Sequence, residues 1–179
     1  GVGLDVGAAK VPIVAGAVLF DLEYGDGRVR PDKNMGYNAC INAQKGIITR
    51  GSVGAGTGAT VGKILGMKYC MKGGIGTASI KLSNGIIVGA IVAVNALGDV
   101  VEPGTGRILA GAMDPNTGTF IDTKKFMLKG HKSTAVLGGN TTIGVVATNA
   151  CLTKEQANKV ASMAHDGFAL AISPVHTMF

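Results

Sequence analysis

The chain has 179 residues, of which 46% are hydrophobic and only 4% aromatic, with 29 glycines and a formal net charge of +6. This length and hydrophobic content predict a single domain with one sizeable core, and they argue against a disordered or fibrous protein. Basic residues are spread along the chain and few aromatic rings are available to stack on bases, so no nucleic-acid partner is expected; the apolar runs are too short to predict a membrane span.

The first part of the chain predicts a strand, a turn and a short helix. Residues Val11 to Glu23 (VPIVAGAVLFDLE) form an apolar run rich in β-branched residues, which predicts a strand. The glycines and the proline of Gly25 to Pro31 predict a loop behind it. Asp32 is then placed to cap a short helix that runs to about Gln44.

A β-hairpin is the clearest local signal in the middle of the chain. Residues Ala78 to Leu82 and Ile86 to Val94 flank the dipeptide Asn84-Gly85, which favours the positive φ angles of a two-residue turn. The second of these strands is apolar on both faces, so we expect it to be central and covered from both sides. Thr141 to Ala150 predicts another buried strand.

The last predicted element is a helix. Thr153 and Gln156 have the spacing of a capping box, and small and apolar residues recur after them on one helical face. The helix is expected to end before Pro174. Strands and helices alternate without a regular βαβ rhythm, which predicts layered sheets with helices outside.

The cysteines and histidines do not form metal-ligand patterns. The three cysteines lack CxxC spacing and predict free thiols in a reducing cytoplasm; they are Cys40, Cys70 and Cys151. The three histidines are isolated from each other and from paired acids, so no metal site is expected; they are His131, His165 and His176.

The stretch Gly51 to Lys63 (GSVGAGTGATVGK) resembles a phosphate-binding loop at first sight. Ile64 stands where a Walker motif needs Ser or Thr, and Thr57 stands where it needs Gly. Gly54, Gly56 and Ala59 fit the dinucleotide pattern, but no acidic residue occurs between positions 32 and 99 to bind a ribose. The residues therefore favour a tight turn entering a helix that reaches position 65, and no nucleotide cofactor is expected.

Asn140-Thr141-Thr142 is a candidate for nucleophilic chemistry, because it follows two glycines and opens a predicted strand. If the Asn140–Thr141 bond were cut, Thr141 would carry a free α-amine beside its hydroxyl. The pKa of an α-amine is about 2.5 units below that of a lysine, so more of it is neutral near pH 7 and able to accept the hydroxyl proton. Alternatively, Thr141 is only a good strand former, or the triplet is a glycosylation site of a secreted protein.

Six segments together resemble the L-aminopeptidase/D-esterase family, whose relatives include β-peptidyl aminopeptidases and nylon-oligomer hydrolases. They follow the order of the family and extend over nearly the whole chain. These segments are VPIVAGAVLFDL (11–22), GYNA (36–39), GSVGAGTGATVGK (51–63), VGAIVAVNALGDV (88–100), GNTTIGVVATNA (139–150) and PVHTMF (174–179).

The resemblance implies an α+β fold, a four-layer αββα sandwich of the N-terminal-nucleophile type. It also implies a precursor that cuts itself once, between Asn140 and Thr141. The products would be a large subunit of residues 1–140 and a small subunit of residues 141–179. By the same resemblance the protein would be a homo-oligomer, a tetramer in the family.

The resemblance also assigns roles to four side chains. Thr141 matches the nucleophile, while Tyr37 and Asn95 match positions that bind the oxyanion and orient the nucleophile. Lys63 matches the lysine of the Thr-type members, where an ammonium would lower the pKa of the Thr141 amine and help to hold charge. The alternatives are a half-buried aromatic at Tyr37, a turn residue at Asn95 and a solvated helix residue at Lys63.

The family pattern continues beyond both ends of this sequence. In the family an acidic D-G-D-type segment that supports the nucleophile follows PVHTMF, and another segment precedes the region matched here. We therefore expect residues 1–179 to be one domain that lacks both family termini, either as a fragment or as a form without part of its site.

The sequence as a whole predicts a self-processing amide or peptide hydrolase, aminopeptidase-like, that uses an N-terminal Thr nucleophile and no cofactor. Its substrates would be short peptides, amino-acid amides or esters. A nylon-type oligoamide hydrolase is an alternative within the same chemistry. An alternative of another class is a non-catalytic or unprocessed structural relative.

Overall fold

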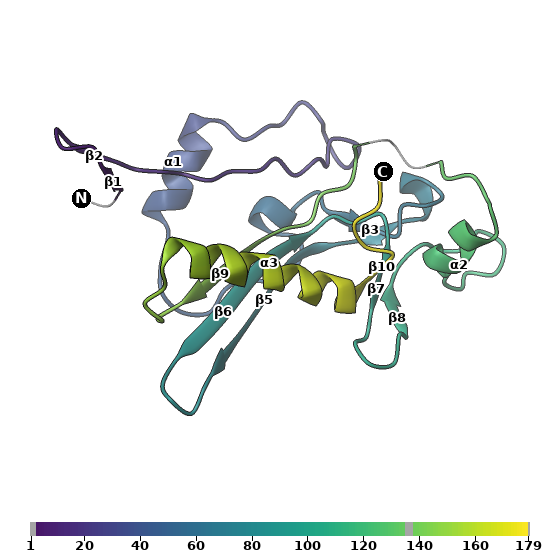
Figure 1. The fold of residues 1–179 in the computed structure, drawn as a ribbon. Helices are drawn as coiled ribbons and strands as arrows, with labels where there is room; N and C mark the ends of the chain where they lie inside the picture. The colour runs from purple at the N-terminus through teal and green to yellow at the C-terminus, as the bar shows by residue number, and fades with distance from the viewer. Residues whose placement is uncertain (1–2, 135–137, 179) are drawn as a thin grey trace.

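The computed structural model describes residues 3–134 and 138–178 (Figure 1). It is an α+β structure of small antiparallel sheets with helices beside them. The largest sheet has the order β5-β6-β9, built from Gly74–Lys81, Ile87–Val94 and Ile143–Thr148. Both pairings are antiparallel, so β6 is the central strand as the sequence predicts.

The hairpin between β5 and β6 confirms the prediction made from Asn84-Gly85. Gly85 has φ +85°, in the left-handed region that glycine occupies without strain. The amide of Leu82 donates to the carbonyl of Ile86 at 2.7 Å, so the loop contains three residues rather than two. The side chains of β6 are mostly half-buried, with Ala93 buried near its end.

A second region of sheet lies beside the first. Its three-stranded part has the order β10-β7-β8, from Ile172–Ser173, Asp99–Val101 and Ile108–Ala110. Short strands β3 (Thr60–Val61) and β4 (Met71–Lys72) pair with each other. Two one-turn 3-10 helices, Gly54–Gly56 and Met67–Tyr69, flank β3.

Two small buried clusters form the core of this second region. One contains Val61, Ala96 and Ile172, and Phe168 of the last helix packs against it. The other contains Ile64, Leu97 and Ala112. Each cluster takes one residue from segment 61–64 and one from segment 96–97. The two clusters therefore pack the segment around Lys63 against the segment around Asn95.

The described residues form three α-helices, of which α3 (Lys154–Ala171) contacts the strands β7, β9 and β10. Helix α1 (Lys33–Ile41) is capped by Asp32, whose carboxylate accepts from the amide of Met35 at 2.8 Å, as predicted. Helix α2 covers Thr123–Leu128. Helix α3 begins at the predicted capping box of Thr153 and Gln156 and ends before Pro174.

The predicted strand at Val11 to Glu23 is wrong for most of its length. Only Lys10–Val11 is a strand, β2, and it pairs with β1 (Leu4–Asp5) in a ribbon at the N-terminal end. Residues 12–20 run extended and pair with no strand in the described parts of the chain (Figure 1). Val14 is 87% exposed, so the apolar pattern is present here without the neighbour that a strand needs.

The predicted helix between the glycine-rich stretch and Leu65 is also wrong. The two β-branched residues Thr60 and Val61 pair with β4 instead, and both are buried. The predicted strand at Thr141 to Ala150 is present as β9, but it is an edge strand and Val145 is 63% exposed. Its apolar residues therefore do not form a buried strand within the described structure.

No helix among the described residues is long and apolar enough to cross a membrane.

Candidate functional site

Lys63 lies two residues after the end of β3 and is almost fully buried, with 6% of its surface exposed. The amides of Gly62 and Lys63 donate to the carbonyls of Gly98 and Leu97, at 3.0 and 2.9 Å. Gly62 has φ +68°, and a Cβ there would collide with the backbone of Gly111 and Ala112. The amides of Gly62 and Lys63 therefore bind other backbone groups of the protein and not a phosphate. The glycine at position 62 allows the two backbone segments to pack closely.

The ammonium of Lys63 has three acceptors, one for each of its protons. Its Nζ donates to Asn95 Oδ1 at 2.6 Å, to the carbonyl of Gly139 at 2.8 Å and to the carbonyl of Asn95 at 3.4 Å. Since a buried ammonium is costly unless hydrogen-bonded, this saturation explains how the charge is accommodated. The solvated-lysine alternative is wrong, and so is the helix it assumed.

Asn95 is fully buried just beyond the end of β6 and binds four segments of the chain. Its Oδ1 also accepts from the amide of Thr60 at 3.0 Å. Its Nδ2 donates to the carbonyl of Phe20 at 2.5 Å and lies 3.5 Å from the carbonyl of Gly139. The side chain thus links residues 20, 60, 63 and 139, which are far apart in sequence.

Burial lowers the pKa of Lys63 to about 8. Negative charge at Cys70, Glu23 and Asp21 acts in the opposite direction and raises this pKa. Since the pKa stays close to neutral pH, Lys63 can exist in either protonation state under mild conditions. Such a shift is common at functional sites, where burial is used to tune an amine.

The Asn140–Thr141 peptide lies against this pair. The amide of Thr141 donates to the carbonyl of Asn95 at 2.8 Å. The ammonium of Lys63 donates to the carbonyl of Gly139, two residues before Thr141. The Thr141 hydroxyl takes part in no hydrogen bond within residues 3–134 and 138–178. The chain is continuous here, so Thr141 contributes an amide N–H and not a free amine.

A cavity of about 140 Å³ opens beside the cluster. Its lining combines the ammonium of Lys63 with one acidic side chain and the residues next to the Asn140–Thr141 bond; the lining residues are Glu23, Lys63, Gly66, Met67, Thr134, Gly139 and Asn140. The side-chain carboxamide of Asn140 is buried, and neither its oxygen nor its nitrogen has a hydrogen-bond partner in the described structure.

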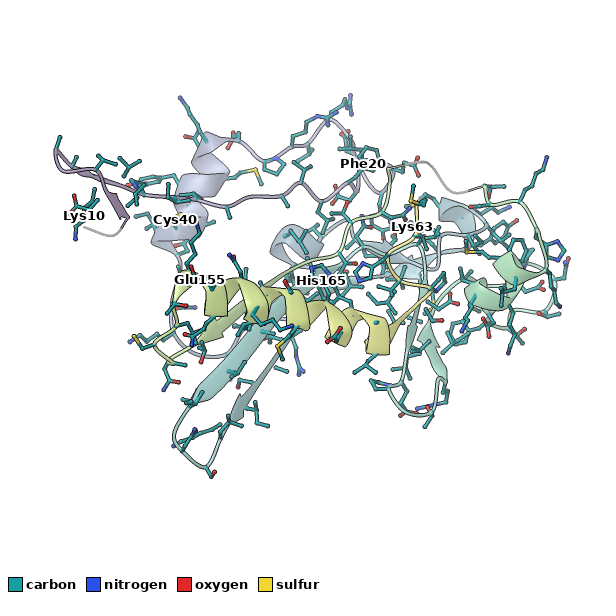
Figure 2. All side chains as sticks on the ribbon, viewed as in Figure 1. Lys10, Phe20, Cys40, Lys63, Glu155 and His165 are labelled. Carbon is teal, nitrogen blue, oxygen red and sulfur yellow. The ribbon has the colours of Figure 1, made fainter. Side chains whose placement is uncertain are left out.

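Tyr37 is not part of this cluster in the structure. It lies on α1 and is 68% exposed, and its hydroxyl makes no hydrogen bond to the other described residues. Figure 2 shows Cys40 of the same helix well away from Lys63, whereas Phe20 is on the side of Lys63. The half-buried aromatic alternative does not hold either, and the role of Tyr37 stays a prediction.

Sequence reasoning missed three contributors to the cluster. Thr60 and the carbonyls of Phe20 and Gly139 bind Asn95 or Lys63 directly. Carbonyl oxygens occur at every position, so no residue pattern announces them. Glu23 was missed as well, although an acid that ends an apolar run is a detectable signal.

The arrangement combines elements that amide chemistry uses. The Thr141 hydroxyl, which has no hydrogen bond among the described residues, directly follows the Asn140 carbonyl in the chain. The carboxamide of Asn140 is buried, and the buried Lys63 ammonium donates to the carbonyl of Gly139. Donors held rigidly in a buried site stabilise developing negative charge with little reorganisation. A threonine at this point would gain its own base if its amine became free.

Known proteins share this sequence organisation. The model of peptidase family S58 matches residues 5–179. The chain is 41% identical to an uncharacterized aminopeptidase of Mycobacterium leprae, over 93% of this chain and 46% of that protein. It is 38% identical to an uncharacterized aminopeptidase of Mycobacterium tuberculosis, over 99% of this chain and 50% of that protein.

A second group of relatives carries a different activity in its name. The chain is 30% identical to the 6-aminohexanoate-oligomer endohydrolase of Paenarthrobacter ureafaciens, over 96% of this chain and 48% of that protein. The chain thus spans about half the length of the curated relatives it matches. Since the family model covers almost every residue, the chain belongs to peptidase family S58, the L-aminopeptidase/D-esterase family.

Proposed function

We propose that the protein is a self-processing amide hydrolase with Thr141 as its nucleophile. Membership of a peptidase family and relatives named as aminopeptidases support hydrolysis of peptides or amides. The observation that carries the proposal is the position of Lys63: its buried ammonium is bonded to both Asn95 and Gly139, directly beside the Asn140–Thr141 bond.

Self-cleavage is the first proposed step. The Thr141 hydroxyl attacks the carbonyl carbon of Asn140, and the acyl group moves from the Thr141 nitrogen to its oxygen. Water then hydrolyses this ester, leaving a carboxylate on Asn140 and a free α-amine on Thr141. The products are residues 1–140 and 141–179, the large and small subunits.

Substrate hydrolysis follows the same chemistry. The freed amine of Thr141 takes the hydroxyl proton while the oxygen attacks the substrate carbonyl, and the proton passes to the leaving amine. Water then releases the acyl group from Thr141. The Lys63 ammonium lowers the pKa of the Thr141 amine, so that the amine is neutral near pH 7.

Asn95 and Tyr37 complete the proposed machinery. The Asn95 side chain is the positioning group that holds Lys63, and it offers an amide N–H near the 139–140 segment. Tyr37 is proposed as an oxyanion donor on the family resemblance alone. Because α1 is apart from the cluster, this role requires α1 to move towards it.

The overall architecture is proposed to be the four-layer αββα sandwich. Helix α3 covers one face of the main sheet, where an added Cβ at Gly144 would lie 3.5 Å from the Phe168 ring. The next residue, Val145, points to the opposite face and is exposed. A second sheet could pack against this exposed apolar face. We also propose that the protein is a cytoplasmic homo-oligomer, a tetramer by family resemblance.

Substrates are proposed to be short peptides, amino-acid amides or esters. Oligoamides of the nylon type are the second candidate, because relatives named 6-aminohexanoate-oligomer endohydrolases align over 96% of the chain. The proposal of another class is a relative that folds similarly and neither cuts itself nor hydrolyses amides.

Intact-mass analysis of the purified full-length protein tests the proposal. Self-cleavage predicts two products that meet at Asn140/Thr141, together with hydrolysis of an aminoacyl p-nitroanilide or a 6-aminohexanoate oligomer. Thr141→Ala should stay whole and inactive, whereas the adjacent Thr142→Ala should still be cut. An uncut protein with full amidase activity would falsify the mechanism, and an uncut, inactive protein would support the structural relative.

A further inference from the structure

Asp99 is a buried carboxyl group that the proposed chemistry does not use. It is the first residue of β7, and 1% of its surface is exposed. Its Oδ1 accepts from the amide of Ala112 at 3.1 Å and from the hydroxyl of Thr123 at 2.8 Å, and its Oδ2 accepts from the amide of Thr123 at 2.7 Å. An asparagine would turn an NH2 group towards one of these donors, so a carboxylate is the group that satisfies all three.

The two residues before Asp99 fix the backbone of Lys63. The amide of Lys63 donates to the carbonyl of Leu97 at 2.9 Å, and the amide of Gly62 donates to the carbonyl of Gly98 at 3.0 Å. The segment that carries Lys63 is therefore paired with the segment that leads into Asp99.

The backbone of Gly111 and Ala112 packs directly on Gly62. A Cβ at Gly62 would collide with this backbone, and a Cβ at Gly111 would collide with the Asp99 carboxylate. Ala112 is also fully buried, in one cluster with Ile64. Because the Asp99 carboxylate accepts from the Ala112 amide, it holds this backbone against the residues on both sides of position 63.

The charge of Asp99 does not set the protonation of Lys63. Burial lowers the pKa of Lys63 to about 8 and is the largest effect on it. The charges that raise this pKa lie on Cys70, Glu23 and Asp21, and Asp99 is not among them in the described part of the chain. Asp99 therefore acts on Lys63 through the packing that buries the ammonium, and loss of that packing would let the pKa rise.

We propose that Asp99 is a positioning residue for Lys63: it holds Ala112 in place and thereby keeps the Lys63 ammonium buried on Asn95 and Gly139. Without the Asp99 carboxylate, the buried amide of Ala112 has no acceptor, so its segment moves outwards to bind water. Water then reaches the Lys63 ammonium. The consequence for catalysis rests on the proposed function, whereas the effect on Lys63 itself does not.

NMR of the full-length protein with isotope-labelled lysine measures the pKa of Lys63 directly. All proteins carry Thr141→Ala, which removes the proposed nucleophile and keeps the chain whole, and Lys63→Met identifies the Lys63 signal. The test variants are Asp99→Asn and the milder Thr123→Val, which removes one of the three donors. Asp122→Ala is the control, because it removes the cap of α2 and leaves the hydrogen bonds of Asp99 in place. Denaturant unfolding checks that each variant folds.

In Asp99→Asn the pKa of Lys63 should rise from about 8 towards the ordinary 10.5, to about 9 or above. Thr123→Val should give a smaller rise, and Asp122→Ala should leave this pKa unchanged. The direction is informative, because removal of a negative charge alone would lower the pKa of an ammonium. An unchanged or lower pKa in Asp99→Asn, or in Thr123→Val if Asp99→Asn does not fold, overturns the inference, and so does an equal rise in Asp122→Ala.

The same variants with Thr141 restored test the consequence for self-cleavage. Asp99→Asn should cut itself at Asn140/Thr141 about tenfold more slowly than the parent protein, and Asp122→Ala at the parental rate. If the parent protein does not cut itself but the pKa of Lys63 rises in Asp99→Asn, the proposed function fails and the role of Asp99 stands. If the parent protein cuts itself and Asp99→Asn keeps both the parental rate and the parental pKa, the proposed function stands and the role of Asp99 fails.

Discussion

Lys63 and Asn95 are joined twice through one ammonium group, which lies 2.6 Å from the side-chain oxygen of Asn95 and 3.4 Å from its carbonyl. Both residues are buried, and they come from segments 32 positions apart. The same carbonyl of Asn95 accepts from the amide of Thr141. A substitution at Lys63 or Asn95 is therefore expected to shift the position of Thr141, the proposed nucleophile.

Replacing Asn95 with Ala should prevent self-cleavage and destabilise the fold. The change leaves the Lys63 ammonium and the Thr60 amide without their side-chain acceptor, for an expected loss of about 3 kcal/mol in the free energy of unfolding. Denaturant unfolding and intact mass measure the two effects. Asn149→Ala is the control: its side chain bonds to Ile87 and Gly85 in an exposed loop region, so the loss should be about 1 kcal/mol and cleavage should be normal.

Stability should rise with pH above about 8 because of Lys63. Its pKa is about 8 in the folded protein against an ordinary 10.5, so between these values the unfolded chain binds more protons at this residue. The free energy of unfolding therefore increases with pH between about 8 and 10.5. Below pH 8 Lys63 is protonated in both states, and the cost of burying its ammonium is fully present. Unfolding curves at several pH values should show this rise, and Lys63→Met should lose it; identical pH slopes in both proteins would contradict the assignment.

Asp99 should contribute more stability than an ordinary exposed helix cap. It is buried, and its carboxylate accepts from the amide of Ala112 and from both the amide and the hydroxyl of Thr123, at 2.7 to 3.1 Å. Asp99→Ala leaves these donors unpaired and should cost about 3 kcal/mol. Asp122→Ala, which removes the half-buried N-cap of helix α2, should cost about 1 kcal/mol by the same denaturant measurement.

Burial also raises the pKa of Asp99, and this outweighs the lowering by its three hydrogen bonds. Because the pKa of Asp99 is raised on folding, the folded chain binds more protons at this residue than the unfolded chain does at pH values just above 3.8. The free energy of unfolding therefore falls as the pH rises from 3.8 through the folded pKa. Asp99→Asn should remove this fall. An unchanged pH dependence between the two proteins would refute the effect.

Tyr37→Phe should lower kcat by about 100-fold with little change in the melting temperature. An oxyanion donor is worth about this much, and the side chain is too exposed on α1 for its hydroxyl to stabilise the fold. Steady-state kinetics on an aminoacyl p-nitroanilide measure the loss. Tyr69→Phe is the control and should keep the parental kcat. If Tyr37→Phe also keeps the parental kcat, the Tyr37 hydroxyl is not an oxyanion donor and the side chain stays exposed on α1 during catalysis.

Local sequence signals determined the elements that depend on short-range chemistry. Asp32 and Thr153 cap their helices because each side-chain oxygen reaches an amide three residues later. Asn84-Gly85 turns the chain because glycine adopts a positive φ without strain. Family membership was also readable from the sequence, because its long segments keep their order over nearly the whole chain.

Only the tertiary structure decided what depends on neighbours distant in sequence. An apolar run such as residues 12–20 has the composition of a strand but becomes one only beside a partner, and Thr60–Val61 became a strand because β4 lies next to it. Likewise, no pattern places the ammonium of Lys63 on Asn95 and Gly139, since those contacts bridge 32 and 76 positions. Burial and long-range hydrogen bonds arise from packing of the whole chain, which is why they brought Lys63, Asn95 and Thr141 together and left Tyr37 exposed.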